Sequence, residues 1–206
     1  MSDPTEASLI DLARKGDRAA FGKLVRMHQR RVMGCAMKML GSPAEADDAT
    51  QETFVRAWRA LAAFDGRSAL STWLYRICVN VSLNAIRSRR RRRTESLDDV
   101  HGDGESIDVT VEGGDPLQEA EGSELRRRVD RALEGLSETL RTTVVLVLMQ
   151  GLSHKDAAEV LGTTEGTVAW RIHEARRRLR GALASDDEPE VAASPTVQTS
   201  AERSHP

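Results

Sequence analysis

The sequence predicts an all-α protein of two small helical domains joined by a flexible acidic linker. Apolar residues recur at helical spacing through residues 9–93 and again through residues 123–183. Residues 94–122 between them hold ten Asp and Glu and no Lys or Arg, a composition too polar for a packed core. Two short segments on either side of Gly162 have the pattern of a helix-turn-helix. We expect residues 1–8 to be flexible and the tail at 184–206 to be disordered.

The N-terminal domain, residues 9–93, is expected to begin with two helices that meet near Gly16-Asp17, and the helical pattern continues to Leu40. The Gly41-Ser42-Pro43 sequence then predicts a helix stop and a restart. The next helix runs from Ala44 to about Ala62 and has two distinct sides. Its apolar side is expected to join the core (Thr50, Phe54, Ala57, Trp58 and Leu61), and its polar side is available for binding (Asp48, Gln51, Glu52, Val55 and Arg59).

A loop over residues 64–68 precedes a long helix, which we expect to begin with a cap at Ser71 or Thr72 and to continue through an arginine block at residues 87–93. Two apolar flanks of this helix leave one narrow polar stripe, with Trp73 at its head (Arg76, Asn80, Asn84, Arg87 and Arg91). Asparagines one turn apart can hydrogen-bond base edges, and flanking arginines can hold phosphates. The alternatives are that both asparagines are solvated surface residues and that Trp73 belongs to the core.

The C-terminal domain, residues 123–183, begins with apolar residues at helical spacing, followed by a helix over Thr139 to Met149. The apolar run at 144–149 could also be a strand, but its place among helices favours a buried helix. Ser153 is expected to cap a helix to Leu161, and Gly162 provides the turn before Thr163 or Thr164 caps the last helix.

This last helix is predicted to bury one side (Val168, Ile172, Ala175 and Leu179) and to expose another (Trp170, His173, Arg177 and Arg180). The exposed side suits a major groove, where apolar groups meet thymine methyls and basic groups meet guanine edges or phosphates. An ordinary surface helix is the alternative reading of this pattern.

Composition argues against several classes of protein. No run reaches the roughly 18 to 20 apolar residues of a membrane span, and the N-terminal sequence is too polar for a signal peptide, so we expect a cytoplasmic protein. Cys35 and Cys78 stand alone in the sequence, which predicts buried or neutral thiols and no metal site. The sequence has no nucleophile–base pair and no phosphate-binding glycine loop, so we expect neither an enzyme nor a cofactor. The net charge of −2 conceals two basic clusters, at residues 87–93 and 176–180.

Two separated blocks resemble the extracytoplasmic-function (ECF) group of bacterial sigma-70 factors. ADDATQETFVRAWRAL with FDGRSALSTWLYRICVNVSLNAIRSRRR resembles region 2 of that family. GLSHKDAAEVLGTTEGTVAWRIHEARRRLR resembles region 4. With flanking helices they cover about three quarters of the chain, in the family's order and with no region 3 domain between them. The resemblance implies a promoter-specificity subunit that binds core RNA polymerase reversibly and reads the −10 and −35 promoter elements, under the control of an anti-sigma factor.

The resemblance also implies residue roles. The positions that bind the coiled coil of the polymerase β′ subunit are matched by Asp48, Gln51 and Glu52, and region 4 is expected to meet the β flap. The −10 element is expected to be melted and held by Asn80 and Asn84 with Ser68 of the preceding loop, and by Arg76, Arg87 and Arg91. The −35 element is expected to be read by Ala169, Trp170, His173 and Glu174, with Arg171, Arg176 and Arg177 on phosphates.

Some positions depart from the family pattern. Ala169 and Trp170 follow Gly-Thr-Val where a basic residue and Ser are common, and Glu174 stands where a basic residue is frequent. These departures predict an unusual −35 sequence. Ser137 replaces a common Pro, which should alter a helix cap more than the fold. The alternative function is a stand-alone helix-turn-helix regulator, which would bind duplex DNA without polymerase and would leave the polar faces of the N-terminal domain unexplained.

Overall fold

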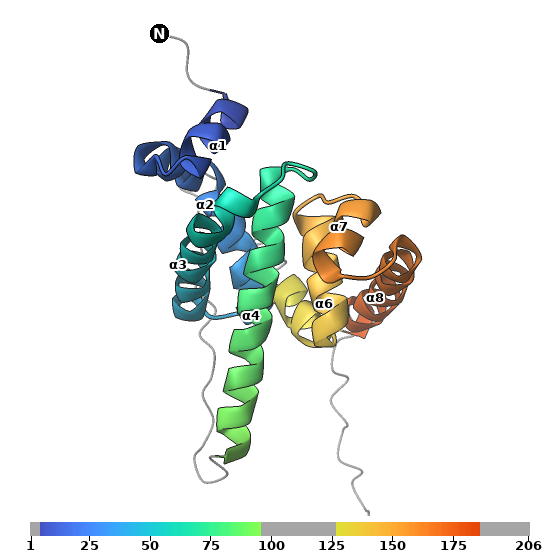
Figure 1. Ribbon diagram of the computed structural model, residues 1–206. Coiled ribbons are helices and arrows are strands. Elements are labelled where there is room, and N and C mark those ends of the chain that lie inside the picture. Colours follow the sequence, from blue (N-terminus) through green and yellow to red (C-terminus); the bar gives the residue numbers. More distant parts are fainter. Residues whose placement is uncertain (1–4, 96–126, 186–206) are drawn as a thin grey trace, which may run out of the picture.

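The computed structural model describes residues 5–95 and 127–185, and within these ranges the chain is helical and contains no strand, which confirms the predicted all-α class. The N-terminal half has α1 (Glu6–Arg14), α2 (Arg18–Leu40), α3 (Pro43–Ala60), the short turn η1 (Leu61–Ala63) and α4 (Leu70–Glu95). The C-terminal half has a helical segment at 127–134, α6 (Glu138–Val144), the π-helical turn η2 (Val145–Met149), α7 (His154–Leu161) and α8 (Glu165–Ser185). Figure 1 shows the two halves side by side, with the C-terminal end of α4 extending beyond both.

The core of the N-terminal half lies between α2, α3 and α4, with α1 packed against α2. The predicted break at Gly16-Asp17 is confirmed. Gly16 has a φ of 95°, a conformation that favours glycine, and the Asp17 carboxylate accepts from the amides of Ala19 and Ala20 to cap α2. From there α2 is continuous to Leu40, where Gly41 ends it and Ser42 caps α3. These local signals set where α2 begins and ends and where α3 begins.

Small buried side chains lie where α2 meets α4. Cys35 and Cys78 are both fully buried, and the Cys78 thiol donates to the carbonyl of Val32 at 3.7 Å. Contact with Cys78, together with burial, raises the pKa of the Cys35 thiol. The predicted burial of both cysteines is therefore confirmed.

Several predicted boundaries were wrong by a few residues. The first helix begins at Glu6 with Thr5 as its cap, so residues 6–8 are helical and not a loose start. α4 begins at Leu70, so Ser71 and Thr72 lie inside its first turn and do not cap it. Leu70 and Thr72 are buried, and this tertiary packing overrides the local capping preference.

Two helices extend past the predicted domain limits. α4 continues to Glu95 and α8 to Ser185, each past the expected domain end. The rest of the expected acidic linker and of the expected tail lies outside the described residues, as do residues 1–4.

The C-terminal half has its core around α6, η2 and α8. Residues 144–149 are helical, as predicted, and Val144, Val145 and Leu146 are buried. The π-type turn was not predicted, and Leu148 and Met149 are exposed at its end, contrary to the predicted burial. Ser137 occupies the N-cap of α6 without a side-chain cap bond, which agrees with an altered cap on an unaltered fold.

The helix-turn-helix is confirmed in detail. The Ser153 hydroxyl accepts from the amide of Asp156 at 3.1 Å and caps α7. Gly162 ends α7 with a φ of 60°, and the Thr164 hydroxyl accepts from the amide of Thr167 at 3.2 Å to cap α8. The predicted inward residues Val168, Ile172 and Ala175 are buried and Leu179 is partly buried, so the opposite side of α8 faces outward.

The two halves contact each other along α4 and α2. Tyr75 of α4 donates its hydroxyl hydrogen to Gln150 Oε1 at 2.8 Å, and Lys38 Nζ of α2 lies 2.6 Å from Asp130 Oδ1. A cavity of about 160 Å³ remains where α4 meets α6, lined by Met39, Ile86, Arg89, Glu138, Arg141 and Thr142. The contact between the halves is therefore partly polar and leaves an unfilled pocket.

None of the helices within residues 5–95 and 127–185 is both long enough and apolar enough to cross a membrane.

Candidate polymerase and nucleic-acid interface

The outward side of α3 forms a polar surface. Asp48 and Gln51 are exposed and Glu52 is partly buried, as the helical pattern predicted. Glu52 Oε1 accepts from Arg56 Nε at 2.7 Å, which holds the carboxylate along the helix. Val55 on the same side is 43% exposed, so an apolar group lies beside the acids. The exposed Arg56 and Arg59 lie near these acids, so the side of α3 presents charges of both signs around an apolar group, a mixture that suits a protein partner.

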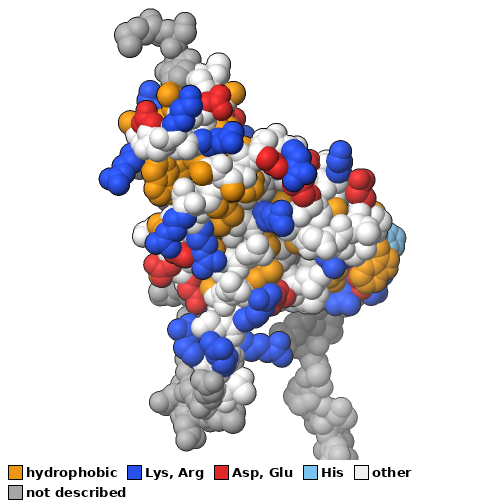
Figure 2. Space-filling model, viewed as in Figure 1, with side chains coloured by type: hydrophobic (Ala, Val, Ile, Leu, Met, Phe, Trp, Pro, Cys, Tyr) orange, Lys and Arg blue, Asp and Glu red, His pale blue; other side chains and the backbone are white. Residues whose placement is uncertain are grey.

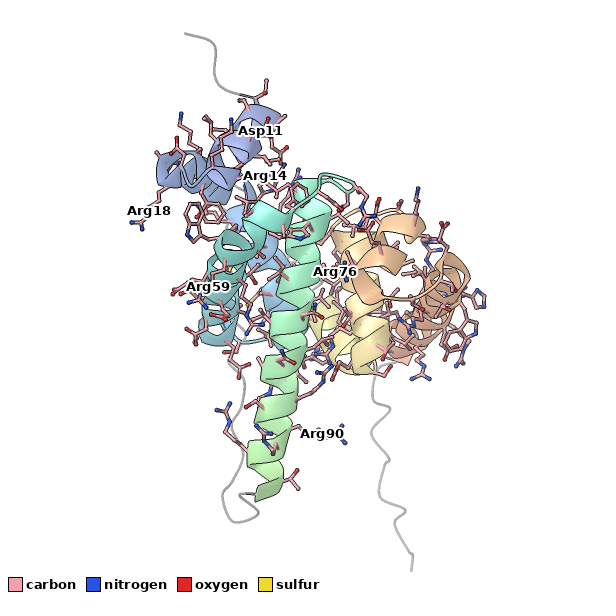
Figure 3. The ribbon with its side chains drawn as sticks, in the orientation of Figure 1. Asp11, Arg14, Arg18, Arg59, Arg76 and Arg90 are labelled. Carbon is pink, nitrogen blue, oxygen red and sulfur yellow. The ribbon has the colours of Figure 1, made fainter. Side chains whose placement is uncertain are left out.

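The polar stripe of α4 is exposed along its length (Arg76, Asn80, Asn84, Arg87 and Arg91). Arg87 Nη1 donates to Asn84 Oδ1 at 3.1 Å, which leaves the amide NH₂ of Asn84 as a donor. Figure 3 shows Arg76 and Arg90 projecting from α4 at two levels, and Figure 2 shows basic side chains gathered around its C-terminal end. The helix thus presents two amides within a cationic surface, whether they bind DNA or are simply solvated.

One arginine of the block is engaged within the fold. Arg89 Nη1 donates to Glu45 Oε2 at 3.0 Å and to the carbonyl of Leu40 at 3.4 Å. Over residues 87–92 the block is therefore divided between a structural contact and an exposed cationic surface, which the sequence alone did not reveal.

The loop before α4 holds Ser68, which is partly buried. Asp65 in this loop accepts from the backbone amide of Arg67 at 3.1 Å, and this bond lowers the pKa of the Asp65 carboxyl. Trp73 packs beside Phe64 with ring centroids 5.1 Å apart and is partly buried against the core. This packing favours the core alternative for Trp73, while Asn80 and Asn84 stay at the surface.

The outward side of α8 combines aromatic, basic and acidic groups. Trp170 is 63% exposed, and Ala169 and His173 are exposed beside it. Arg176 and Arg177 are exposed and Arg171 is partly buried. In Figure 2, hydrophobic and histidine side chains lie next to basic ones at the edge formed by α8. A large exposed indole beside basic side chains is a feature of recognition surfaces.

Glu174 lies among the arginines of this surface. Its Oε1 accepts from Arg177 Nη2 at 2.8 Å and from Arg178 Nε at 2.7 Å, and its Oε2 accepts from Arg177 Nε at 2.8 Å. These bonds to Arg177 and Arg178 lower the pKa of Glu174 to about 2, so the group is a carboxylate at neutral pH. Arg178 was not among the predicted site residues, although its spacing of four from Glu174 was the signal that could have found it.

The predicted residues lie on three surfaces and not in one pocket. The surfaces on α3 and α4 belong to the N-terminal half, and the α8 surface belongs to the C-terminal half. Sequence reasoning missed the contact between the halves, including the bond from Tyr75 to Gln150. The second apolar flank of α4 was the signal in the sequence that could have indicated this contact.

Comparison with known families identifies both halves. Residues 24–92 match the family described as sigma-70 region 2, and residues 126–179 match the family described as sigma-70, region 4. The ECF RNA polymerase sigma-E factor of Haemophilus influenzae is 35% identical over 182 residues, which is 87% of this chain and 95% of that protein. The RNA polymerase sigma-H factor of Pseudomonas aeruginosa is 34% identical over 190 residues, 89% of this chain and 96% of that protein.

Solved structures agree with the sequence comparison. CnrH, solved in complex with the cytosolic domain of CnrY, is 31% identical with a TM-score of 0.62. The match covers 86% of this chain and 96% of the CnrH chain. The sigma factor RpoE of Bartonella quintana, solved with the anti-sigma factor NepR, is 27% identical with a TM-score of 0.66. The match covers 81% of this chain and 98% of the RpoE chain. The chain therefore belongs to the extracytoplasmic-function group of the sigma-70 family and is an RNA polymerase sigma factor, not an enzyme.

Proposed function

We propose that this sigma factor divides its work between its two halves. The N-terminal half docks on core polymerase through α3 and opens the −10 element with α4, and the C-terminal half reads the −35 element with α8. The observation that carries this proposal is the exposure of three chemically different surfaces on three helices: acidic on α3, amide and arginine on α4, aromatic and basic on α8.

Asp48, Gln51 and Glu52 are the residues that we assign to docking on core polymerase. These side chains are exposed or partly exposed on the side of α3 that points away from the bundle core. Their charge complements a basic helical partner such as the β′ coiled coil, with Val55 adding an apolar contact. The β flap is the expected partner of the C-terminal half.

Promoter opening falls to α4. Asn80 and Asn84 lie one helical turn apart, and an amide can both donate to and accept from the edge of an extruded base. Arg76, Arg87 and Arg91 on the same stripe supply positive charge for the neighbouring phosphates. Ser68, in the loop at the head of the stripe, borders the place where that base would lie.

Recognition of the upstream element falls to α8. Ala169, Trp170 and His173 occupy the exposed side near the start of this helix, where a helix-turn-helix meets base edges. Arg171, Arg176 and Arg177 provide charge for phosphates. The large indole favours contact with a thymine methyl, so the preferred −35 sequence should contain a thymine that this residue selects.

We propose that the halves separate when both elements are read. The −35 and −10 elements are named for their positions, which lie about 25 base pairs apart. At 3.4 Å per base pair this separation is about 85 Å of duplex. In the structure the halves touch through Tyr75 and Gln150. A chain of 31 residues, the number from 96 to 126, can span at most about 110 Å when extended, which is enough to join the two sites. We therefore assign the structure to a closed arrangement and promoter binding to an open one.

Control by an anti-sigma factor follows from the solved relatives, because CnrH and RpoE are described in complexes with CnrY and the anti-sigma factor NepR. An inhibitor of this chain would cover the polymerase-docking surfaces of both halves. Such a factor and its polymerase work in the bacterial cytoplasm, which is where we place the protein.

The test is the double variant Asn80→Ala with Asn84→Ala. Both side chains are exposed, so the variant should fold, bind core polymerase with unchanged affinity and fail to open promoter DNA. Permanganate reactivity of unpaired thymines measures opening, and fluorescence anisotropy measures core binding. Loss of core binding, or normal opening, would remove α4 from the proposed role.

A further inference from the structure

Glu174 is an acid in the middle of the α8 surface that is proposed to face DNA. Trp170 lies one turn before it, and Arg177 and Arg178 lie one turn after it on the same side of the helix. The Glu174 side chain is only 16% exposed, whereas the side chains of Arg177 and Arg178, which both bond to it, are 64% and 49% exposed. The carboxylate is thus positioned behind the arginines, and the arginines face solvent.

The hydrogen bonds leave much of each guanidinium available. Arg177 uses Nε and Nη2 in a two-pronged contact with both carboxylate oxygens, at 2.8 Å each. Arg178 uses only Nε, at 2.7 Å. A guanidinium has five N–H donors, so three remain on Arg177 and four on Arg178. The fork geometry of a guanidinium matches a phosphate or the O6 and N7 edge of guanine, so these remaining donors are suited to either group.

We propose that Glu174 is a positioning residue that fixes Arg177 and Arg178 in the orientation needed for the −35 element and does not itself read a base. This inference rests on the proposed role of α8. Two arginines without a partner would sample many rotamers, and their ordering would oppose binding. The carboxylate orders them in the free protein. It also cancels one positive charge, which weakens attraction to every DNA sequence alike.

The two effects of Glu174 have opposite consequences for specific and nonspecific DNA. Removing the carboxylate should strengthen binding to unrelated duplex, because one more positive charge meets phosphates, and the salt slope of log K should steepen by up to about 0.9. Binding to the correct −35 element should weaken, because the arginines are no longer held in place. A residue that contributed charge alone would strengthen both.

The experiment uses holoenzyme assembled with wild-type protein, Glu174→Gln or Glu174→Ala. Each is titrated on one promoter with its −35 element intact and on the same fragment with that element replaced, at several salt concentrations. The matched control is Glu159→Gln, which removes one exposed acid from α7 in the same helix-turn-helix. We expect Glu174→Ala to lower the ratio of specific to nonspecific affinity at least tenfold, and Glu159→Gln to leave the ratio unchanged.

A second comparison separates positioning from direct reading. In protein that already carries Arg177→Ala and Arg178→Ala, Glu174→Ala should have no further effect on the ratio. A further loss confined to one base pair would mean that Glu174 reads that base, which overturns the inference. An unchanged ratio in Glu174→Ala alone, with normal helicity by circular dichroism, would also overturn it. If wild-type holoenzyme does not distinguish the two fragments, the proposed role of α8 fails first, and this inference fails with it.

Discussion

Replacing Tyr75 by Phe should shift the sigma factor toward its open arrangement. Tyr75 is buried, and its hydroxyl donates to Gln150 Oε1 across the contact between the halves at 2.8 Å. Burial raises the pKa of Tyr75 to about 12, so the hydroxyl keeps its proton at neutral pH. The substitution removes this bond while the aromatic ring stays in place.

The expected size follows from one neutral hydrogen bond, which contributes about 1 kcal/mol net. That free energy corresponds to about a fivefold change in an equilibrium constant. The pair between Lys38 and Asp130 also joins the halves, but both side chains are about one-third exposed, so it contributes only about 0.5 kcal/mol. Adding Asp130→Asn should therefore bring the total shift to about tenfold.

Single-molecule energy transfer measures the shift. Dyes on cysteines introduced at the exposed positions Ala62 and Glu159 report the separation of the halves, since the native Cys35 and Cys78 are buried. The low-transfer population should rise about fivefold in Tyr75→Phe. If only the open form is competent, the apparent affinity for a two-element promoter complex should rise by the same factor.

Two results bear on the reasoning directly. Gln150→Ala combined with Tyr75→Phe should behave like Tyr75→Phe alone, because both remove the same bond. An unchanged low-transfer population in Tyr75→Phe would refute the view that this contact holds the halves together.

Three further predictions follow from the surfaces and caps. Asp48→Ala should weaken core polymerase binding at least tenfold in anisotropy titrations, whereas Asp11→Ala on α1 should not, because both acids are exposed but only Asp48 lies on the docking side of α3. Trp170→Ala should weaken transcription from promoters that depend on the −35 element and spare others, because the 63% exposed indole contributes recognition and not core packing; an unchanged −35 preference would remove it from the reading surface. Ser153→Ala should lower the free energy of unfolding of the C-terminal half by about 1 kcal/mol through loss of the α7 cap, as measured by urea denaturation, and a loss near zero would mean that water replaces the cap.

The parts of the fold that could be predicted are those with local causes. Ser153, Gly162 and Thr164 each act through their own backbone conformation and nearest amides, so the helix-turn-helix could be placed residue by residue. The exposed faces of α3 and α4 followed from the 3.6-residue period, because that period decides which side chains point away from a core. The resemblance to a family then supplied roles that the period could not.

The parts that could not be predicted depend on contacts between distant residues. The period predicted two apolar flanks on the helix that holds Tyr75, but not that Gln150, 75 residues later, would accept its hydrogen bond. Arg89 belongs to a run of identical residues, and only the approach of α3 brings Glu45 to it and not to its neighbours. The true start of α4 at Leu70 was likewise decided by burial in the bundle and not by the nearby Ser and Thr.

The most direct test of the account is transcription in vitro by bacterial core polymerase, with and without this protein, on fragmented genomic DNA from its source. Mapped 5′ ends should fall at discrete starts that require the protein and share two upstream elements at a fixed spacing. The absence of protein-dependent starts, with folded protein that binds the same DNA tightly without polymerase, would contradict the account and indicate a stand-alone regulator.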